Sequence, residues 1–313
     1  MNHSSGRNQR GLTLVEMMVA MTIGMILLGG VITVLTSSKV TYRVNEAMAR
    51  MQENARFAFQ LLSRDLRMAG YWGCGGVVPQ GVDQPLEGLD AVTDTFVIRG
   101  VDGNGVVVDS HSPTDMNFKV PAGAGFKAGQ TVLVSNCQSA AILQVTGVIT
   151  ASGKDVISYA LVKNNPKGDF AFANGEAIRI NTREYYIGAG KSGVPALFQK
   201  IVQIPPQSFE LVEGIEDMQI RYGVDTNGDR AVDKYWTADD VASGSGKIRD
   251  CVDIKCRWNA VVSVRIDLLV QSVEDGIASQ PQTYTFDGNT VTPTDRRLRQ
   301  TFSTVISLRN RAS

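Results

Sequence analysis

The chain has 313 residues, with 31 Lys plus Arg against 31 Asp plus Glu, two His and four Cys, so its formal net charge is zero. This balance excludes a basic nucleic-acid-binding protein. Apolar residues make up 43% of the chain and charged residues 20%, which excludes disorder along the whole chain and predicts a hydrophobic core. One apolar run near the N-terminus is far more hydrophobic than the rest and follows a polar, basic leader.

The first predicted element is the run from Leu12 to Leu35, which contains 24 residues and one ionisable side chain, Glu16. A helix of this length spans a bilayer. Arg7 and Arg10 precede the run, so the positive-inside rule places residues 1–11 in the cytoplasm and the rest of the chain outside. No small-residue cleavage site closes the run, which favours a retained anchor over a cleavable secretory signal.

The lone carboxylate of Glu16 needs a positive partner, because an unpaired charge in a bilayer costs on the order of a few kcal/mol. The segment from Arg10 to Glu16 (RGLTLVE) resembles the signal of type IV prepilins. The resemblance implies that a membrane peptidase cleaves between Gly11 and Leu12 and methylates the new amino group of Leu12. Glu16 would then neutralise the N-terminal amine of a neighbouring subunit in a filament. An ordinary single-pass anchor is the alternative, with Glu16 reaching the membrane interface.

The second half of this helix is predicted from apolar residues at helical spacing. They are Val40, Val44, Met48, Met51, Ala55, Ala58, Leu62 and Leu66. Gly70 is a natural stop, so we expect one helix from Leu12 to Ala69. Because the first half is apolar all round and the second half has one stripe, the second half should pack on a globular head while the first half protrudes. This divides the chain into a leader at 1–11, a helix at 12–69 and a head at 70–313.

The head is predicted to be β-rich, because short β-branched runs alternate with turn residues. The runs are Thr95–Ile98, Thr131–Val134, Val156–Ala160, Met218–Tyr222 and Phe302–Leu308. Alternation from Val262 to Val270 predicts a half-buried antiparallel strand. The expected fold class is therefore α+β, with a long N-terminal helix whose first half is transmembrane and a large antiparallel β-rich head. One elaborated domain and two small sheets are both possible.

All four cysteines lie on the outer side of the membrane, where an oxidising compartment favours disulfides. They are Cys74, Cys137, Cys251 and Cys256. Of three connectivities, we favour Cys251 with Cys256, since this short loop is entropically easiest to close, which leaves Cys74 with Cys137. A zinc site is disfavoured by the spacings and by the scarcity of histidine.

Two stretches at the end of the predicted helix, Gln52–Arg56 (QENAR) and Leu62–Cys74 (LSRDLRMAGYWGC), resemble the PilW family of type IV minor pilins. Tyr222–Asp225, the strand near residue 264 and Leu308–Asn310 resemble it too. The resemblance implies a minor pilin that primes pilus assembly and then joins the filament at its tip. It also implies a role in cell adhesion and twitching motility. Its implied partners are other minor pilins, the major pilin, a PilY-type adhesin and the prepilin peptidase.

The implied location is the inner membrane for the single-pass precursor, with a periplasmic head, and the extracellular pilus for the mature form.

Two alternative functions remain. A pseudopilin of a type II secretion system shares the cleavage motif, and a membrane-anchored periplasmic protein could carry a β-rich head. An enzyme is disfavoured because no acid and base set converges in the sequence and His111 stands alone on a loop-like stretch, where we expect it to be solvated.

A possible calcium loop has oxygen ligands at positions one, three, five, seven and nine. They are Asp225, Asn227, Asp229, the Ala231 carbonyl and Asp233. Arg230 stands where such loops have glycine, and Trp236 where they have glutamate. The alternative is a hairpin without metal, in which Asn227 and Gly228 form a tight turn. Calcium is the one cofactor that the sequence suggests.

Overall fold

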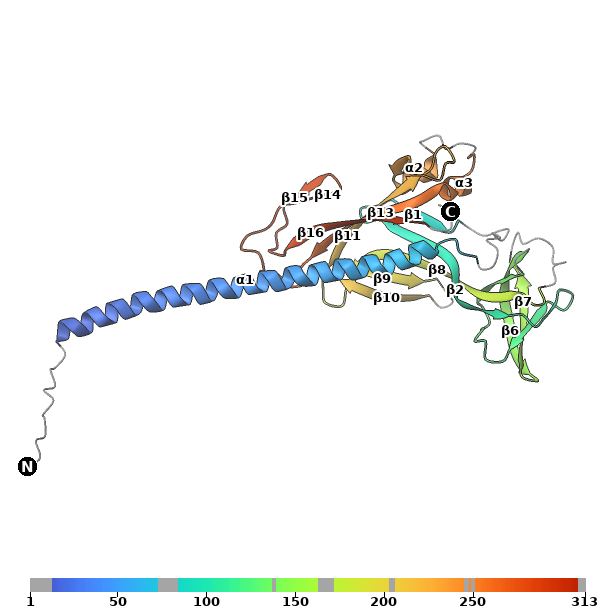
Figure 1. Cartoon of the computed structure of the whole chain (residues 1–313), viewed down its shortest axis with the longest axis horizontal. Coiled ribbons are helices and arrows are strands. Elements are labelled where there is room, and N and C mark those ends of the chain that lie inside the picture. The colour runs from blue at the N-terminus through green and yellow to red at the C-terminus, as the bar shows by residue number, and fades with distance from the viewer. Residues whose placement is uncertain are drawn as a thin grey trace, which may run out of the picture.

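The computed structural model shows a long helix that leads into a head of antiparallel strands (Figure 1). It describes residues 13–72, 84–136, 139–162, 172–202, 206–244, 248 and 251–308. Every strand pair among these residues is antiparallel. The predicted α+β class is therefore confirmed.

The N-terminal helix, α1 (Leu14–Met68), has 55 residues and begins after the N-cap Thr13. It ends at the C-cap Ala69 and is followed by Gly70, whose φ of 72° lies in the left-handed region that favours glycine. The single continuous helix predicted from the sequence is thus present. Within the described residues, α1 is the one helix long and apolar enough to cross a membrane.

The apolar stripe of α1 packs on the head over a shorter length than the sequence predicted. Met51, Ala55, Ala58, Leu62 and Leu66 are buried. Val40 and Met48, which continue the same stripe, are 51% and 40% exposed. The helix still contacts the loop after β13 in this region, since Arg43 Nη2 lies 3.8 Å from Glu274 Oε2, but Val40 and Met48 themselves are not covered by that contact.

Most strands form one ten-stranded sheet with the order β1-β2-β8-β5-β6-β7-β4-β3, in which β9 pairs with β8 and β10 pairs with β9. The strands are β1 (Leu86–Leu89), β2 (Thr95–Val107), β3 (Ser110–Ser112), β4 (Asn117–Pro121), β5 (Thr131–Ser135), β6 (Ala140–Ala151), β7 (Lys154–Leu161), β8 (Glu176–Ala189), β9 (Pro195–Ile201) and β10 (Gln207–Glu213). The long strand β8 pairs with β5 at its start and with β9 at its end. It therefore joins the two ends of the head.

The remaining strands lie in a four-stranded sheet with the order β12-β11-β13-β16 and in a separate hairpin, β14-β15. They are β11 (Ile215–Val224), β12 (Lys234–Trp236), β13 (Val261–Gln271), β14 (Tyr284–Phe286), β15 (Asn289–Val291) and β16 (Arg299–Ser307), with two short helices, α2 (Ala238–Ser243) and α3 (Ile254–Asn259). The strand predicted near residue 264 is β13. It is more buried than expected on its outer face, since Ser263 is 3% exposed and its hydroxyl contacts the Tyr235 hydroxyl of β12 at 3.4 Å.

Two main hydrophobic cores lie along this framework. The proximal core joins the second half of α1 to β2, β8, β11, β13 and the short helices, and includes Leu62, Tyr222 and Trp258. The distal core contains residues of the four strands β4, β5, β6 and β7, among them Phe118 and Ile157. Figure 1 places β6 and β7 at the end of the head away from the N-terminus. The head thus contains a large and a smaller sheet that share the proximal core, a combination of the two arrangements that the sequence left open.

Candidate assembly interface

The start of α1 is held by a reciprocal pair of side chains. Glu16 accepts hydrogen bonds from the Thr13 backbone N–H (2.9 Å) and from Thr13 Oγ1 (3.0 Å), while the Glu16 N–H donates to Thr13 Oγ1 (3.3 Å). This capping box satisfies N–H groups that a helix otherwise leaves unpaired. The spacing Thr-x-x-Glu could have revealed it in the sequence. Gly11 and Leu12 lie outside the described residues, so cleavage between them stays a prediction.

The first half of α1 is an exposed apolar cylinder. Leu14, Met18, Met25 and Ile26 are between 62% and 77% exposed, and the large apolar residues between them are at least 50% exposed. Such a surface is unstable in water, because burying one Leu, Ile or Met side chain is worth about 1.5–3 kcal/mol. The first half of α1 therefore needs lipid or other apolar helices around it, which fits a membrane anchor.

The second half of α1 is joined to the head by a buried carboxylate. Asp65 is 5% exposed and accepts hydrogen bonds from the Tyr185 hydroxyl of β8 and from Gln199 Nε2 of β9 (3.3 Å). Arg64 Nε lies 3.0 Å and Arg183 Nη1 3.6 Å from its oxygens. Burial, followed by the charge of Asp65, raises the pKa of the Tyr185 phenol well above its usual range, so Tyr185 stays a donor.

Sequence reasoning did not single out this joint. Asp65 lies between Leu62 and Leu66 on the apolar stripe of α1, and a charged residue there predicts a buried, paired carboxylate. Its partners come from strands more than a hundred residues away, as the separations of 120 and 134 residues show. The signal therefore existed for Asp65 but not for Tyr185 or Gln199. The joint links α1 to β8 and β9 of the head.

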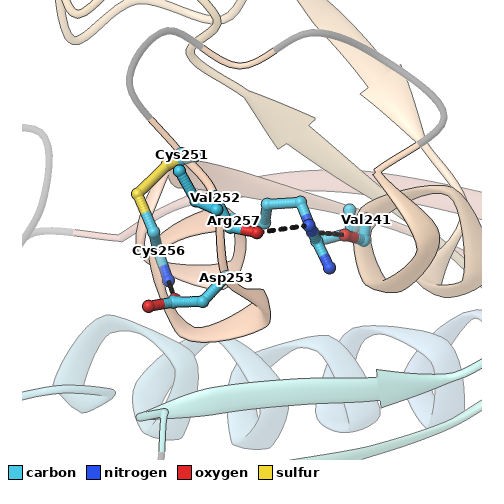
Figure 2. The surroundings of a disulfide bond; sticks show 6 residues. All are labelled: Val241, Cys251, Val252, Asp253, Cys256 and Arg257. Carbon is cyan, nitrogen blue, oxygen red and sulfur yellow. Dashed lines mark hydrogen bonds between the residues drawn. A yellow bond between two sulfur atoms is a disulfide. The ribbon is translucent and has the colours of Figure 1, made fainter.

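The predicted pair Cys251 and Cys256 forms a disulfide across five residues, with a Cα–Cα distance of 5.3 Å. Figure 2 shows it at the start of α3, where the N-cap Asp253 accepts from the Cys256 N–H at 2.7 Å. Arg257 Nε also donates to the Val241 carbonyl of α2 at 3.0 Å (Figure 2). The disulfide thus closes a short loop at the start of α3, and the Arg257 side chain docks α3 against α2. The other proposed pair, Cys74 with Cys137, lies outside the described residues.

The loop proposed for calcium connects β11 to β12, so the expected hairpin is present. The predicted tight turn at Asn227 and Gly228 is wrong. Val224 pairs directly with Lys234, and the connection runs from Asp225 to Asp233. The loop is long because its own side chains stabilise it. Thr226, for example, donates its N–H and its hydroxyl to Asp233 at 2.7 and 2.6 Å.

The carboxylates of this loop are oriented toward backbone N–H groups. Asp225 accepts from Asn227, Gly228 and Arg230 at 3.1, 2.6 and 2.8 Å. Burial raises the pKa of Asp225, but these bonds outweigh it and hold that pKa below its usual value. Arg230, at the position where calcium loops have glycine, has a φ of 66°.

Asp229 and Asn227 continue the pattern. Asp229 accepts from the Ala231 N–H and Asn227 from the Asp229 N–H, both at 2.8 Å. The part of the chain that the structure describes contains no group of three or more His, Cys, Asp or Glu side chains placed to hold a metal ion. Calcium binding therefore stays a prediction.

His111 is not the solvated surface residue that the sequence predicted. It lies on β3, half-buried, and its Nδ1 accepts from the Phe172 N–H at 3.3 Å. Its Nε2 then carries the proton and donates to the Tyr159 hydroxyl at 2.8 Å. The ring also stacks on Tyr159 with a centroid distance of 5.7 Å. These contacts give His111 a packing role at the edge of the distal core.

Two family models match the chain. Residues 6–32 match the prokaryotic N-terminal methylation motif, and residues 184–310 match type IV pilus-assembly protein W. The chain therefore carries the N-terminal methylation motif together with a region similar to PilW. The first match contains the prepilin segment and the start of α1. The second contains the end of β8, the four-stranded sheet and both short helices, whereas β3 to β7 lie outside both matches.

Two proteins of Thermus thermophilus are similar to this chain. The pilin-like protein PilA3 is 36% identical over 69 residues, which are 21% of this chain and 30% of that protein. The chain thus matches less than a third of the length of this relative. A solved type IV-like pilin aligns with 84% of this chain and 99% of its own, with 12% identity and a TM-score of 0.38.

Proposed function

We propose that this pilin primes the assembly of type IV pili and then joins the filament at its tip, together with other minor pilins and a PilY-type adhesin. The precursor is anchored in the inner membrane by α1, with its head in the periplasm, until the prepilin peptidase processes it. The mature form is extracellular and adjoins the major pilin. The role is structural rather than catalytic. The observation that carries the proposal is α1 itself, apolar and exposed in its first half and joined to the head by its second half.

The physical basis is that the first half of α1 has an apolar environment both in the membrane and in the filament. During assembly it moves from lipid into a bundle of similar helices, so its side chains need not enter water. Glu16 is the exception, because its charge must be paired in the bundle. We infer that it pairs with the methylated amine of Leu12 of a neighbouring subunit. Subunits in the wrong register would leave this carboxylate unpaired, which gives assembly its selectivity.

The direct test is mass spectrometry of surface filaments sheared from the native host. A peptide beginning with N-methylated Leu12 is the expected result, and it would establish cleavage, export and incorporation together. Recovery of the intact residue 1 terminus, in the inner membrane alone, would refute the proposal. Deletion of the gene should abolish surface pili and leave protein secretion intact, whereas lost secretion with normal pili would identify a type II pseudopilin.

Two substitutions separate processing from assembly. Gly11→Val should leave the full-length precursor in the membrane, while Gly24→Val, where a side chain meets no atom within 4 Å, should be processed normally. Glu16→Leu should still be cleaved but incorporate poorly into filaments. Normal processing of Gly11→Val would contradict the cleavage site, and unchanged filament content with Glu16→Leu would contradict the pairing of Glu16.

A further inference from the structure

Strand β16 forms an outer edge of the four-stranded sheet, since β13 is its one partner among the described strands. The Leu308 N–H donates to Val262 of β13, and the Ser272 N–H donates to the Leu298 carbonyl. Because backbone groups alternate in direction along a strand, the even-numbered residues of β16 face β13. The odd-numbered residues Thr301, Ser303, Val305 and Ser307 therefore direct their N–H and C=O groups to the free edge.

From Thr301 to Ser307 this edge lacks the devices by which proteins normally protect exposed strands, whereas at its start the Arg299 N–H donates to Gln282 Oε1 at 3.5 Å. It runs for nine residues, pairs with β13 without a register shift, and contains no Pro or Lys. The other edge strands among the described residues differ. The strands β1, β3 and β12 have three or four residues, and β10 has a register shift beside Glu210. A long, regular and unprotected edge is a template for another strand.

An open groove lies between this edge and α1. Its volume is about 800 Å³, and it is lined by α1 residues from Gln52 to Met68 together with Phe302 and Ser303 of β16. A strand added to β16 would therefore lie along the flank of α1. One face of that strand would meet Phe59 and Met68, which offer apolar contacts.

The charge of the groove indicates what it would bind. Three arginines of α1, Arg56, Arg64 and Arg67, line it, and no acidic side chain does. Arg64 donates to Asp65. Arg56 and Arg67 are exposed and have no carboxylate partner among the residues that the structure describes. Acidic side chains on an added strand would form ion pairs with these two guanidinium groups.

We propose that the edge of β16 binds an extended, acidic segment of another protein by strand addition. The backbone of the segment pairs with the odd-numbered residues of β16, and its carboxylates pair with Arg56 and Arg67. A second copy of this chain fits less well, because two β16 edges would bring two sets of these arginines together. The proposal does not depend on the assembly role, since binding can be measured on the isolated chain.

The test uses the full-length chain in non-ionic detergent micelles and a fluorescent peptide of alternating valine and glutamate, as long as the nine residues of β16. Fluorescence anisotropy should show saturable binding, and a valine–lysine peptide should not bind. Deuterium uptake by the β16 segment should fall when the glutamate peptide is present. No binding of the glutamate peptide, or equal binding of both peptides, would overturn the proposal.

Matched variants locate the site. Ser303→Pro removes an edge-facing N–H but no bond to β13, so it should weaken binding at least about tenfold, while Ser303→Ala should bind normally. Arg56→Glu with Arg67→Glu should weaken binding similarly, whereas Arg43→Glu with Arg50→Glu, on α1 outside this groove, should not. Binding unaffected by Ser303→Pro would exclude the edge. Dimers of the free chain that Ser303→Pro abolishes would identify a second copy as the occupant and overturn the proposal.

Discussion

The joint between α1 and the head predicts a measurable loss when Tyr185 is replaced by phenylalanine. Tyr185 is 0% exposed and its hydroxyl donates to Asp65. Phenylalanine keeps the ring that stacks on Phe96, whose centroid lies 5.0 Å away, so the substitution removes the hydroxyl alone. A hydrogen bond to a charged group contributes about 1.5–3 kcal/mol, and the free energy of unfolding should fall by that amount.

A matched control and a double-mutant cycle make this prediction specific. Tyr186→Phe, at the next residue of β8, removes the hydroxyl of a half-buried tyrosine that has no side-chain hydrogen bond to the described residues, and should change stability by about 0.5 kcal/mol or less. Asp65→Ala should cost about 3–5 kcal/mol, since it leaves buried donors without an acceptor. In that background Tyr185→Phe should cost much less, which gives a coupling energy of about 1–3 kcal/mol.

The assay is urea unfolding of the full-length chain in detergent, followed by tryptophan fluorescence. Trp258 is 1% exposed and belongs to the same proximal core, so its emission reports on that region. Equal stabilities of Tyr185→Phe and Tyr186→Phe would refute the reasoning. So would a coupling energy near zero, because the hydroxyl and the carboxylate would then act independently.

Three further predictions concern the head. Replacing Cys251 and Cys256 with serine should lower the free energy of unfolding by about 2 kcal/mol, as loop-closure entropy gives for a short loop, and unchanged urea midpoints would contradict this. Burial raises the pKa of Asp94 from its usual 3.8 to about 6, so its contribution to stability is present below pH 3.8 and is lost as the pH rises through 6. Asp94→Ala should flatten this part of the pH dependence of unfolding, and an unchanged slope would show that Asp94 is not its source. If the loop after β11 binds Ca²⁺, calcium should raise the melting temperature and Asp229→Ala should abolish the shift, whereas calorimetry without any calcium effect would leave a metal-free loop.

The sequence predicted those features that depend on neighbours along the chain. Helical spacing from Val40 to Leu66 predicted one continuous α1, and the alternation around Val264 predicted β13. The pair Cys251 and Cys256 was predicted because a five-residue separation is easy to close. Each of these signals reflects periodicity or loop-closure entropy over a short stretch of the chain. None of them requires knowledge of the fold.

The sequence was less successful where a loop or a boundary depends on its surroundings. Asn227 and Gly228 have the composition of a tight turn, yet Asp225 and Asp233 hold a longer loop by accepting backbone N–H groups. Val40 has the spacing of a packed residue but is 51% exposed. In both cases the local pattern was correct and the contacts available around it decided the outcome.

By itself, then, the sequence determined the anchor, the single long helix, the β-rich head and the local disulfide. The tertiary structure alone decided the partners of Asp65, the bridging of two cores by β8 and the position of β16 at a free edge. The physical reason is that strand order and buried polar pairs join residues far apart in the chain, as the separation of 120 residues between Asp65 and Tyr185 shows. Periodicity specifies which face of an element is buried, but the packing of all elements together specifies what that face meets.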